Sequence, residues 1–309
     1  MKIVFMGTPD FAVPTLKMLH ENHEVLLVVT QPDREVGRKR IKQPSPVKIL
    51  AIELGIPVIQ PDHLRDEEHI VIDLKPDFIV TAAYGQMLSK HLLEQVPALN
   101  VHGSLLPKYR GGAPIQYALF DGMKETGVTV MYMANQMDSG DIIKQEKVMI
   151  RDQDDAHSLM LRMREVGASL LKDVLTDISQ NKIDRIPQDI KDVTFAYTIK
   201  RQDEFINFNQ TARDIINRIR GLAPEPGASA IFENKTIKFF KAKTSDIIES
   251  KEKPGTIIDL DKRFVIQAKD GAIEILEILV PGKKRMDIQS FLNGQTLFKM
   301  GDRFHKGEE

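Results

Sequence analysis

The sequence predicts an α/β protein with a doubly wound, mainly parallel sheet in its N-terminal domain and a smaller C-terminal β-barrel domain. Two observations predict this fold class. In the first half, short apolar runs alternate with amphipathic stretches, which is typical of parallel strands whose connecting helices cover both faces of the sheet. Near the C-terminus, brief β-prone runs follow one another with turn residues between them. The length of 309 residues is enough for two domains of ordinary size.

Each strand of the expected parallel sheet is a short run of apolar residues. We expect these strands at residues 2–6, 24–30, 58–60, 77–83 and 99–102, with two edge strands at 127–134 and 141–150. We expect helices between them at residues 11–22, 46–54 and 67–74. A long helix over residues 156–178 should close this domain, because apolar residues recur there every three or four positions. The N-terminal domain therefore reads as a Rossmann-like unit over residues 1–182.

The C-terminal region has a different character. Residues 183–203 mix polar residues with little periodicity, which is typical of a linker between domains. The domain that follows, residues 204–309, should open with a short helix at 211–221. We expect its strands at residues 228–232, 236–241, 255–259, 264–268 and 272–279. Several short strands so close together indicate a small barrel, of the kind that oligonucleotide-binding folds use.

The composition excludes several classes of function. The chain has no cysteine, so it has neither a disulfide framework, nor thiolate metal ligands, nor a cysteine nucleophile. Lys and Arg total 43 against 44 Asp and Glu, which argues against a uniformly basic nucleic-acid binder but allows a local basic patch. No apolar stretch approaches the length of a membrane span. We expect a cytoplasmic protein with no obligate protein partner.

The turn after the first expected strand does not carry a dinucleotide-binding fingerprint. That fingerprint needs three glycines in the pattern G-x-G-x-x-G, whereas only Gly7 is present and Pro9 follows it. We therefore expect Gly7 to make a tight turn, and we expect no nicotinamide cofactor. His20 and His23 lie close together in the sequence, but no third ligand accompanies them, so we expect no metal site.

The segment around residues 100–116 is the strongest candidate for chemistry. Asn100 and His102 are two positions apart on an expected strand, which puts both side chains on one face. They lie at the carboxyl end of that strand, where open α/β sheets bind ligands. An amide beside an imidazole can stabilise an oxyanion while the imidazole moves a proton, as acyl transfer requires. Gly103 and Gly111–Gly112 would let the backbone approach a ligand closely. The alternative for His102 is a core histidine that caps a turn.

A turn after the next expected strand offers a carboxylate. Asp138 and Asp141 both lie in it, and either can orient His102 or accept a proton. The alternative is a plain turn-forming acid. The sequence alone does not choose between these two residues.

At these residues the sequence resembles the folate-dependent formyltransferases. The pattern is Asn100-x-His102, then Ser104-Leu-Leu-Pro107, then Asp138 about 36 residues after the histidine. Four further stretches agree: Gly7-Thr-Pro-Asp-Phe11, Thr30-Gln-Pro-Asp33, Pro44-Ser-Pro-Val-Lys48 and Ala83-Tyr-Gly85. The resemblance implies that the formyl donor is 10-formyltetrahydrofolate. Over nearly its full length the chain is most similar to the family member whose acceptor is the α-amine of methionine on initiator tRNA.

The resemblance also implies roles for particular residues. Asn100, His102 and Asp138 would be the catalytic residues. The folate pocket would be lined by Ser104, Leu105, Leu106, Pro107, Gly85, Gln86, Met87 and Leu88. Neither a metal ion nor a nicotinamide cofactor is implied. The chemistry fits these residue types, because Asn100 and His102 can donate to the developing oxyanion and Asp138 can relay the proton of the amine.

A basic run lies between the second expected strand and the next helix. Residues 34–42 contain five basic residues and one acid, in a connection that is unusually long for a compact α/β domain. It leaves the carboxyl end of a strand and can therefore overhang the site. The resemblance implies an insertion that enters the acceptor arm of tRNA, with tRNA contacts from Arg38, Lys39, Arg40 and Lys42. The alternative is a solvated run of charges.

Two other functions remain open. The same fold and donor can serve a small amine acceptor, such as an amino sugar nucleotide or a purine precursor. The basic run and the C-terminal β domain argue against this, because a small acceptor needs neither. A non-catalytic RNA-binding protein is the second alternative, and the complete set of Asn100, His102 and Asp138 argues against it.

Overall fold

The computed structural model describes residues 1–36, 41–247 and 251–306. The chain forms two compact units. The first unit comprises Met1–Pro114, Glu125–Met149 and Met160–Tyr197. The second unit comprises Ile115–Lys124, Ile150–Leu159 and Thr198–Glu309. Two short stretches from the first half of the sequence therefore pack with the C-terminal part.

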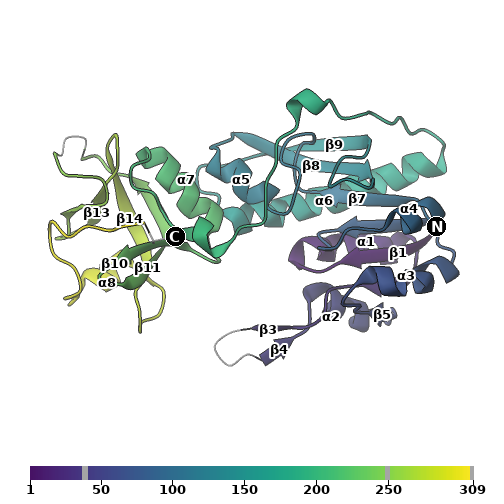
Figure 1. Ribbon diagram of the computed structural model, residues 1–309, viewed down its shortest axis with the longest axis horizontal. Coiled ribbons are helices and arrows are strands. Elements are labelled where there is room, and N and C mark those ends of the chain that lie inside the picture. The colour runs from purple at the N-terminus through teal and green to yellow at the C-terminus, as the bar shows by residue number, and fades with distance from the viewer. Residues whose placement is uncertain (37–40, 248–250, 307–309) are drawn as a thin grey trace. The chain divides into compact units, whose positions relative to one another are not determined.

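The first unit is built on a seven-stranded sheet in the order β5-β2-β1-β6-β7-β8-β9 (Figure 1). Its strands are β1 (Lys2–Gly7), β2 (Glu24–Val29), β5 (Val58–Ile59), β6 (Phe78–Ala82), β7 (Ala98–His102), β8 (Glu125–Tyr132) and β9 (Ile142–Met149). The strands from β5 to β7 pair in parallel, whereas β8 and β9 are antiparallel at one edge. The chain runs outward from β1 in one direction and then returns through β6 in the other. This confirms the doubly wound, mainly parallel sheet.

Helices connect the strands as the apolar periodicity predicts. They are α1 (Val13–Asn22), α2 (Pro46–Glu53), α3 (Leu64–Asp73), α4 (Lys90–Gln95), α5 (Pro114–Phe120) and α6 (Ala156–Ser179). Side-chain caps start three of them: Ser45 accepts from the Lys48 amide, Ser89 accepts from the Leu92 amide, and Asp155 accepts from the Ser158 amide. The sequence analysis did not predict α4 and α5, because helices of six and seven residues are too short to show a repeating apolar face.

The alternation of side chains along β7 decides which way the candidate site faces. Ala98 belongs to a buried cluster that includes residues of β1, β6, α3 and α4. On the opposite face, Gly167 of α6 lies against Val101 and Val128. Because successive side chains of a strand point to opposite faces, Asn100 and His102 share the face of Ala98.

The described ends of the basic run pair as two short strands, where the sequence predicted a long loop. β3 (Arg34–Val36) pairs antiparallel with β4 (Ile41–Gln43), and Glu35 stands opposite Lys42. Strands of three residues, in which half of the side chains are charged, are too short to show an apolar alternation, so the pattern could not reveal them. Lys42 is exposed. Arg38, Lys39 and Arg40, which the sequence analysis also singled out, lie outside the described residues.

The second unit contains a six-stranded antiparallel sheet. Its strands are β10 (Ala228–Phe232), β11 (Lys235–Thr244), β12 (Ile257–Asp259), β13 (Phe264–Gln267), β14 (Ala272–Leu279) and β15 (Met286–Asp287), and its main helices are α7 (Ala212–Leu222) and α8 (Ile288–Leu292). The five predicted strands are present. The sequence analysis missed β15 and α8, which have only two and five residues.

The last described residues connect the two edge strands of this sheet. Ile231 of β10 and His305 donate to each other's carbonyl oxygens at 2.9 Å. On the other edge, Ile257 of β12 donates to Asp302 at 2.8 Å. Between these contacts, the Phe304 side chain is buried among other phenylalanine rings. The C-terminal segment therefore pairs with edges that would otherwise be open, and it closes the curled sheet into the predicted barrel.

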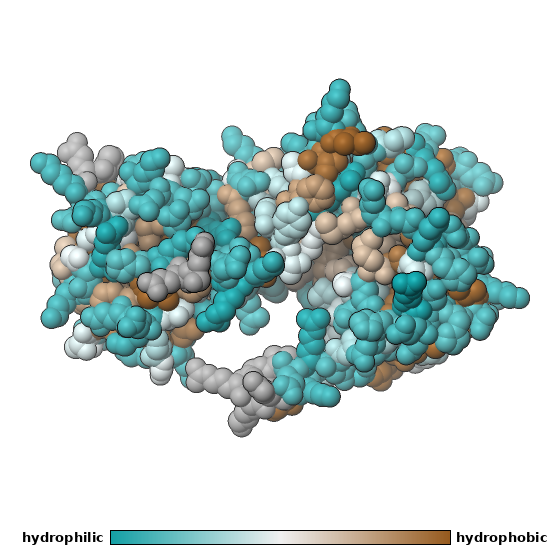
Figure 2. All heavy atoms as spheres, viewed as in Figure 1, coloured by the Kyte–Doolittle hydropathy of each residue, from teal (hydrophilic) through white to brown (hydrophobic). Residues whose placement is uncertain are grey.

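Hydrophilic side chains cover most of the visible face, and hydrophobic ones appear there in small groups (Figure 2). Single exposed apolar residues are ordinary on a protein surface. In the described ranges, no helix combines the length and the apolar character that crossing a bilayer requires.

Candidate active site

The structure brings together Asn100, His102 and Asp138. Asn100 and His102 end β7, whereas Asp138 lies in the turn between β8 and β9. The Asn100 Nδ2 atom donates to Asp138 Oδ1 at 3.3 Å. The His102 Nδ1 atom lies 3.7 Å from Asp138 Oδ2. The side chain of His102 is 6% exposed and that of Asp138 is 16% exposed, so the three groups meet in a largely desolvated place.

A neighbouring strand fixes the amide of Asn100. Thr81 stands opposite Asn100 in the β6–β7 register, and its hydroxyl donates to Asn100 Oδ1 at 2.8 Å. The oxygen of the amide is therefore held toward β6, and the nitrogen faces Asp138. Nδ2 carries two hydrogens and Asp138 takes one of them, so the second can be donated to a substrate oxygen.

His102 makes the contact expected of a core histidine through one ring nitrogen and faces Asp138 with the other. Its Nε2 atom lies 2.9 Å from the carbonyl oxygen of Tyr109. Because a carbonyl oxygen only accepts, Nε2 must carry the hydrogen. The ring therefore caps the loop after β7 through Nε2, as a core histidine would. Its other nitrogen, Nδ1, faces the Asp138 carboxylate and is the atom at which a proton can be gained or lost.

Asp138, rather than Asp141, supplies the carboxylate. Its φ angle is +48°, in the left-handed region that aspartate tolerates better than most residues. The backbone amide of Gly111 donates to Asp138 Oδ2 at 2.8 Å. Each carboxylate oxygen thus has a donor, one from the end of β7 and one from the loop that follows it. These contacts direct the carboxylate at His102.

Gly111 has a different role from the one expected. Its φ of +120° is strained for any residue with a side chain, and a Cβ atom would lie 2.5 Å from the carbonyl oxygen of Ala196. The glycine therefore makes room for the predicted linker. The amide of this glycine, which donates to Asp138, is the part that serves the site.

The expected folate-lining residues after β7 are partly buried. The Ser104 side chain is fully buried, and its hydroxyl donates to the Lys108 carbonyl oxygen at 2.6 Å. Leu106 is 3% exposed and packs with Met131 and Ile142. Leu105 and Pro107 are partly exposed. Ser104 and Leu106 thus shape the loop, and Leu105 and Pro107 remain accessible to a ligand.

The loop after β6 likewise contains both buried and exposed residues of the expected folate set. Gly85 and Met87 are exposed, and Leu88 is buried in the cluster around α3 and α4. The Gln86 side chain accepts from the Leu64 amide at 2.9 Å and so anchors the start of α3. A ligand on this loop would therefore meet Gly85 and Met87 first. The assignment of both loops to folate stays a prediction.

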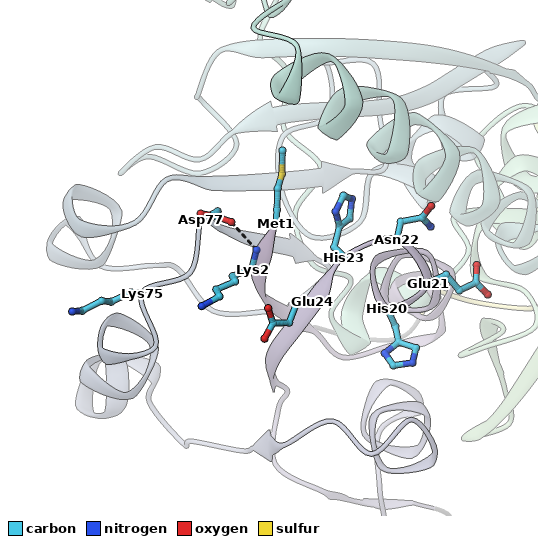
Figure 3. A pocket seen from close by; sticks show the side chains of 9 residues that line it. All are labelled: Met1, Lys2, His20, Glu21, Asn22, His23, Glu24, Lys75 and Asp77. Atoms are coloured by element: carbon cyan, nitrogen blue, oxygen red, sulfur yellow. Dashed lines mark hydrogen bonds between the residues drawn. The ribbon is translucent and has the colours of Figure 1, made fainter.

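A shallow hollow of about 780 Å³ lies elsewhere on the first unit (Figure 3). It is lined by residues at the amino ends of β1 and β2, including Lys2, His20 and His23. Burial, followed by the charge of the Met1 ammonium group, lowers the pKa of His23. Among the described residues, no three His, Cys, Asp or Glu side chains are placed to hold a metal ion. The hollow lies at the end of the sheet opposite to Asn100 and His102, so we do not assign the chemistry to it.

Sequence reasoning missed two residues beside the site. Arg110 is 9% exposed, and burial lowers the pKa of its guanidinium while the charge of Asp138 opposes that change. Gln188 hydrogen-bonds to Arg110 and to the turn that carries Asp138. Gln188 lies in the predicted linker, where no periodicity or motif marks it. For Arg110, its place between Pro107 and Gly111 in the motif-rich segment was the available signal.

The class of the protein follows from comparison of this site and fold with known families. The Formyl transferase family matches residues 1–175, and the Formyl transferase C-terminal domain family matches residues 198–296. The chain therefore belongs to the formyl transferase family, which confirms the resemblance found in the sequence. Curated relatives from Listeria innocua and Macrococcus caseolyticus are both named methionyl-tRNA formyltransferase. The first is 48% identical over 95% of both chains, and the second is 44% identical over 99% of both chains.

Solved structures share the fold. An N-formyltransferase from Helicobacter canadensis, in complex with folinic acid and dTDP-3-aminofucose, has a TM-score of 0.70 and 23% identity, over 89% of this chain and 98% of that chain. HypX from Aquifex aeolicus, in complex with tetrahydrofolic acid, has a TM-score of 0.65 and 18% identity. This chain spans half of HypX. At such identities the likeness establishes the fold.

Proposed function

We propose that this protein transfers the formyl group of 10-formyltetrahydrofolate to the α-amine of methionyl-initiator tRNA, which gives N-formylmethionyl-tRNA for translation initiation in the cytoplasm. The meeting of Asn100, His102 and Asp138 at the carboxyl end of the sheet is the observation that carries this proposal. The relatives that bear this activity in their names, at 44–48% identity over nearly the full chain, support the choice of acceptor.

The residues stabilise the charge that develops on the formyl group. The uncharged methionine amine attacks the formyl carbon, and the formyl oxygen gains negative charge as the new C–N bond forms. Asn100 Nδ2 and a protonated His102 Nδ1 can both donate to this oxygen. Because the imidazole and the carboxylate are largely shielded from water, such hydrogen bonds are stronger than they would be in bulk solvent.

Asp138 handles the proton. The attacking nitrogen must lose a proton, and N10 of the folate must gain one when the bond between N10 and the formyl carbon breaks. The Asp138 carboxylate accepts the first proton and returns it to N10, directly or through water. Its contacts with Asn100 and Gly111 hold it in place for both transfers.

The two loops beside the trio are suited to the folate. Gly85 and Met87 are exposed on one loop, and Leu105 and Pro107 are accessible on the other. The Gln31 Nε2 atom is buried without a hydrogen-bond partner among the described residues, and it lies 3.9 Å from where a Cβ at Gly85 would be. A polar ring atom of a ligand would give this buried donor the partner that it lacks. We assign the full folate set predicted from the sequence, Gly85–Leu88 and Ser104–Pro107, to this pocket.

The tRNA would be bound by other parts of the chain. We assign catalysis to residues 1–182, a linker to residues 183–203 and tRNA binding to the barrel of residues 204–309. Arg38, Lys39, Arg40 and Lys42 supply further phosphate contacts from the basic run. This division needs no protein partner and no membrane.

Transfer of labelled formyl from 10-formyltetrahydrofolate to three acceptors tests the proposal. The acceptors are methionyl-initiator tRNA, uncharged initiator tRNA and a dTDP-amino sugar. We expect label only in the methionyl-tRNA. Label in the amino sugar alone would favour a sugar formyltransferase. Binding of tRNA without transfer to any acceptor would favour a non-catalytic RNA-binding protein, and either result would contradict the proposal.

A further inference from the structure

We infer that Gln188 is a positioning residue of this active site, and that it holds the Asp138 turn and the Arg110 guanidinium in their working places. The inference rests on the proposed function, because it assumes that Asp138 transfers the proton. Gln188 comes from the segment that the sequence predicts as a linker. It belongs neither to β7, which carries Asn100 and His102, nor to the turn that carries Asp138.

The oxygen and the nitrogen of the Gln188 side-chain amide both form hydrogen bonds. Its Oε1 atom accepts from Arg110 Nε at 3.0 Å and from Arg110 Nη2 at 2.8 Å. Its Nε2 atom donates to the carbonyl oxygens of Asp138 and Gly140, each at 2.8 Å. Both lone pairs of Oε1 and both hydrogens of Nε2 therefore take part in hydrogen bonds. A carboxylate of the same length lacks the donors, and an alkyl side chain lacks both.

The Asp138 turn needs such support. A left-handed φ of +48° costs an aspartate free energy and persists only where the surroundings enforce it. The two carbonyl oxygens that Gln188 holds lie on either side of Ser139, so the turn directly after Asp138 is fixed, including one of the two peptide groups that flank the Asp138 Cα atom. The contacts of the carboxylate with Asn100 and His102, at 3.3 and 3.7 Å, are long enough that a small rotation would lose them.

Arg110 gives a second reason for an uncharged amide at this position. Arg110 is 9% exposed as a residue, and its guanidinium lies in the field of the Asp138 carboxylate. A buried cation without an acceptor would be drawn to that carboxylate and would compete with Asn100 and His102 for its oxygens. Gln188 gives two of the guanidinium's N–H groups an acceptor and leaves the Asp138 carboxylate to the catalytic pair.

Backbone bonds fix Gln188 from both sides. Before it, Ile186 and Ile142 exchange two hydrogen bonds of 2.9 Å. After it, the Arg110 amide donates to Thr194 at 2.9 Å and the Ala196 amide donates to Arg110 at 2.8 Å. All of these residues belong to the first unit. The segment is therefore bonded to the start of β9 and to the loop after β7, and Gln188 is held at a fixed point between them.

Steady-state formylation by Gln188→Ala tests the inference. We expect kcat to fall about 10- to 100-fold, the effect typical of a lost supporting hydrogen bond or a displacement of about 1 Å. The KM values for methionyl-tRNA and for 10-formyltetrahydrofolate should change less than about twofold, because Gln188 touches neither substrate. Gln180→Ala is the matched control, since Gln180 is exposed and bonds only within its own neighbourhood to Lys182. It should keep the wild-type kcat.

Gln188→Glu separates positioning from folding. This variant keeps an acceptor for Arg110, and therefore should fold, but it loses both donors to the Asp138 turn. We expect its kcat to fall at least as far as that of Gln188→Ala, with rates expressed per molecule that binds tetrahydrofolate. A wild-type kcat in folded Gln188→Glu would overturn the inference, as would equal losses in kcat and in both substrate affinities. Failure of the wild-type protein to formylate methionyl-tRNA would instead overturn the proposed function.

Discussion

The amide nitrogen of Asn100 lies 3.3 Å from a carboxylate oxygen of Asp138, although 38 positions separate the two residues in the sequence. The other oxygen of the same carboxylate accepts from the backbone of Gly111 and faces His102. One carboxylate thus connects the end of β7, the loop after it and the turn between β8 and β9. An amide N–H donor and a carboxylate are therefore held beside each other.

Asp138→Asn should lower kcat by roughly 100- to 10,000-fold, the range that general acid–base catalysis supplies. The amide has the size of the carboxylate but cannot accept the proton of the attacking amine, and one of its ends would present hydrogens to Asn100. Steady-state kinetics with both substrates measure the effect. Asp141→Asn is the matched control from the same turn and should stay near the wild-type rate. Similar losses in both variants would contradict the choice of Asp138.

Neutralising Arg38, Lys39, Arg40 and Lys42 together should weaken tRNA binding. Each phosphate contact releases condensed counterions, so the slope of log affinity against log salt concentration should become shallower. The stability of the protein should hardly change, because exposed charges contribute little to it. Binding of methionyl-tRNA at several salt concentrations measures the slope, and tetrahydrofolate binding, which should be unchanged, is the control. An unaltered slope would favour the alternative, in which residues 34–42 are only a solvated run of charges.

Asp33 should make the fold sensitive to acid. Hydrogen bonds from Lys48, at 2.9 and 2.7 Å, and then from Gln60, at 2.8 Å, hold the pKa of Asp33 below the ordinary value of an aspartate. A lowered pKa in the folded state stabilises the fold above the ordinary pKa of the group, and this contribution is lost as the pH falls through the lowered value. The difference in stability between wild type and Asp33→Asn should therefore be largest near neutral pH and shrink below about pH 4. Urea unfolding at pH 7, 5 and 3 measures it, and a constant difference would contradict the assignment.

The parts of the fold that repeat a simple pattern were predictable. The expected strands at 228–232 and 272–279 have the bounds found in the structure, because apolar residues and turn residues mark both ends. The shared face of Asn100 and His102 followed from the two-residue period of a strand. These predictions need only local information, and local information is what a single sequence contains.

The features that the sequence did not reveal depend on contacts between distant segments. The residue pattern alone left Asp138 and Asp141 open, and only the resemblance chose Asp138; the turn between β8 and β9 brings Asp138 to His102. Gln188 donates to the carbonyl oxygen of Asp138, although 50 positions separate the two residues in the sequence. The segment that contains Gln188 has no apolar periodicity and no motif. The closing of the barrel depends on the hydrogen bonds that His305 exchanges with Ile231 on one edge strand and that Asp302 accepts from Ile257 on the other. Arg38 lies outside the described residues, and its contact with tRNA stays a prediction.

The most direct test of the account is the single-turnover rate of formyl transfer by His102→Ala, at saturating 10-formyltetrahydrofolate and methionyl-tRNA. The account predicts a fall of at least about 100- to 1000-fold, the cost of one lost oxyanion donor, with the affinities for both substrates nearly unchanged. The variant also loses the bond from Nε2 to Tyr109, so the rate is expressed per folded molecule and a melting curve is recorded beside it. A lower melting temperature with a near-normal rate per folded molecule would show that His102 only caps its loop, and would contradict the account.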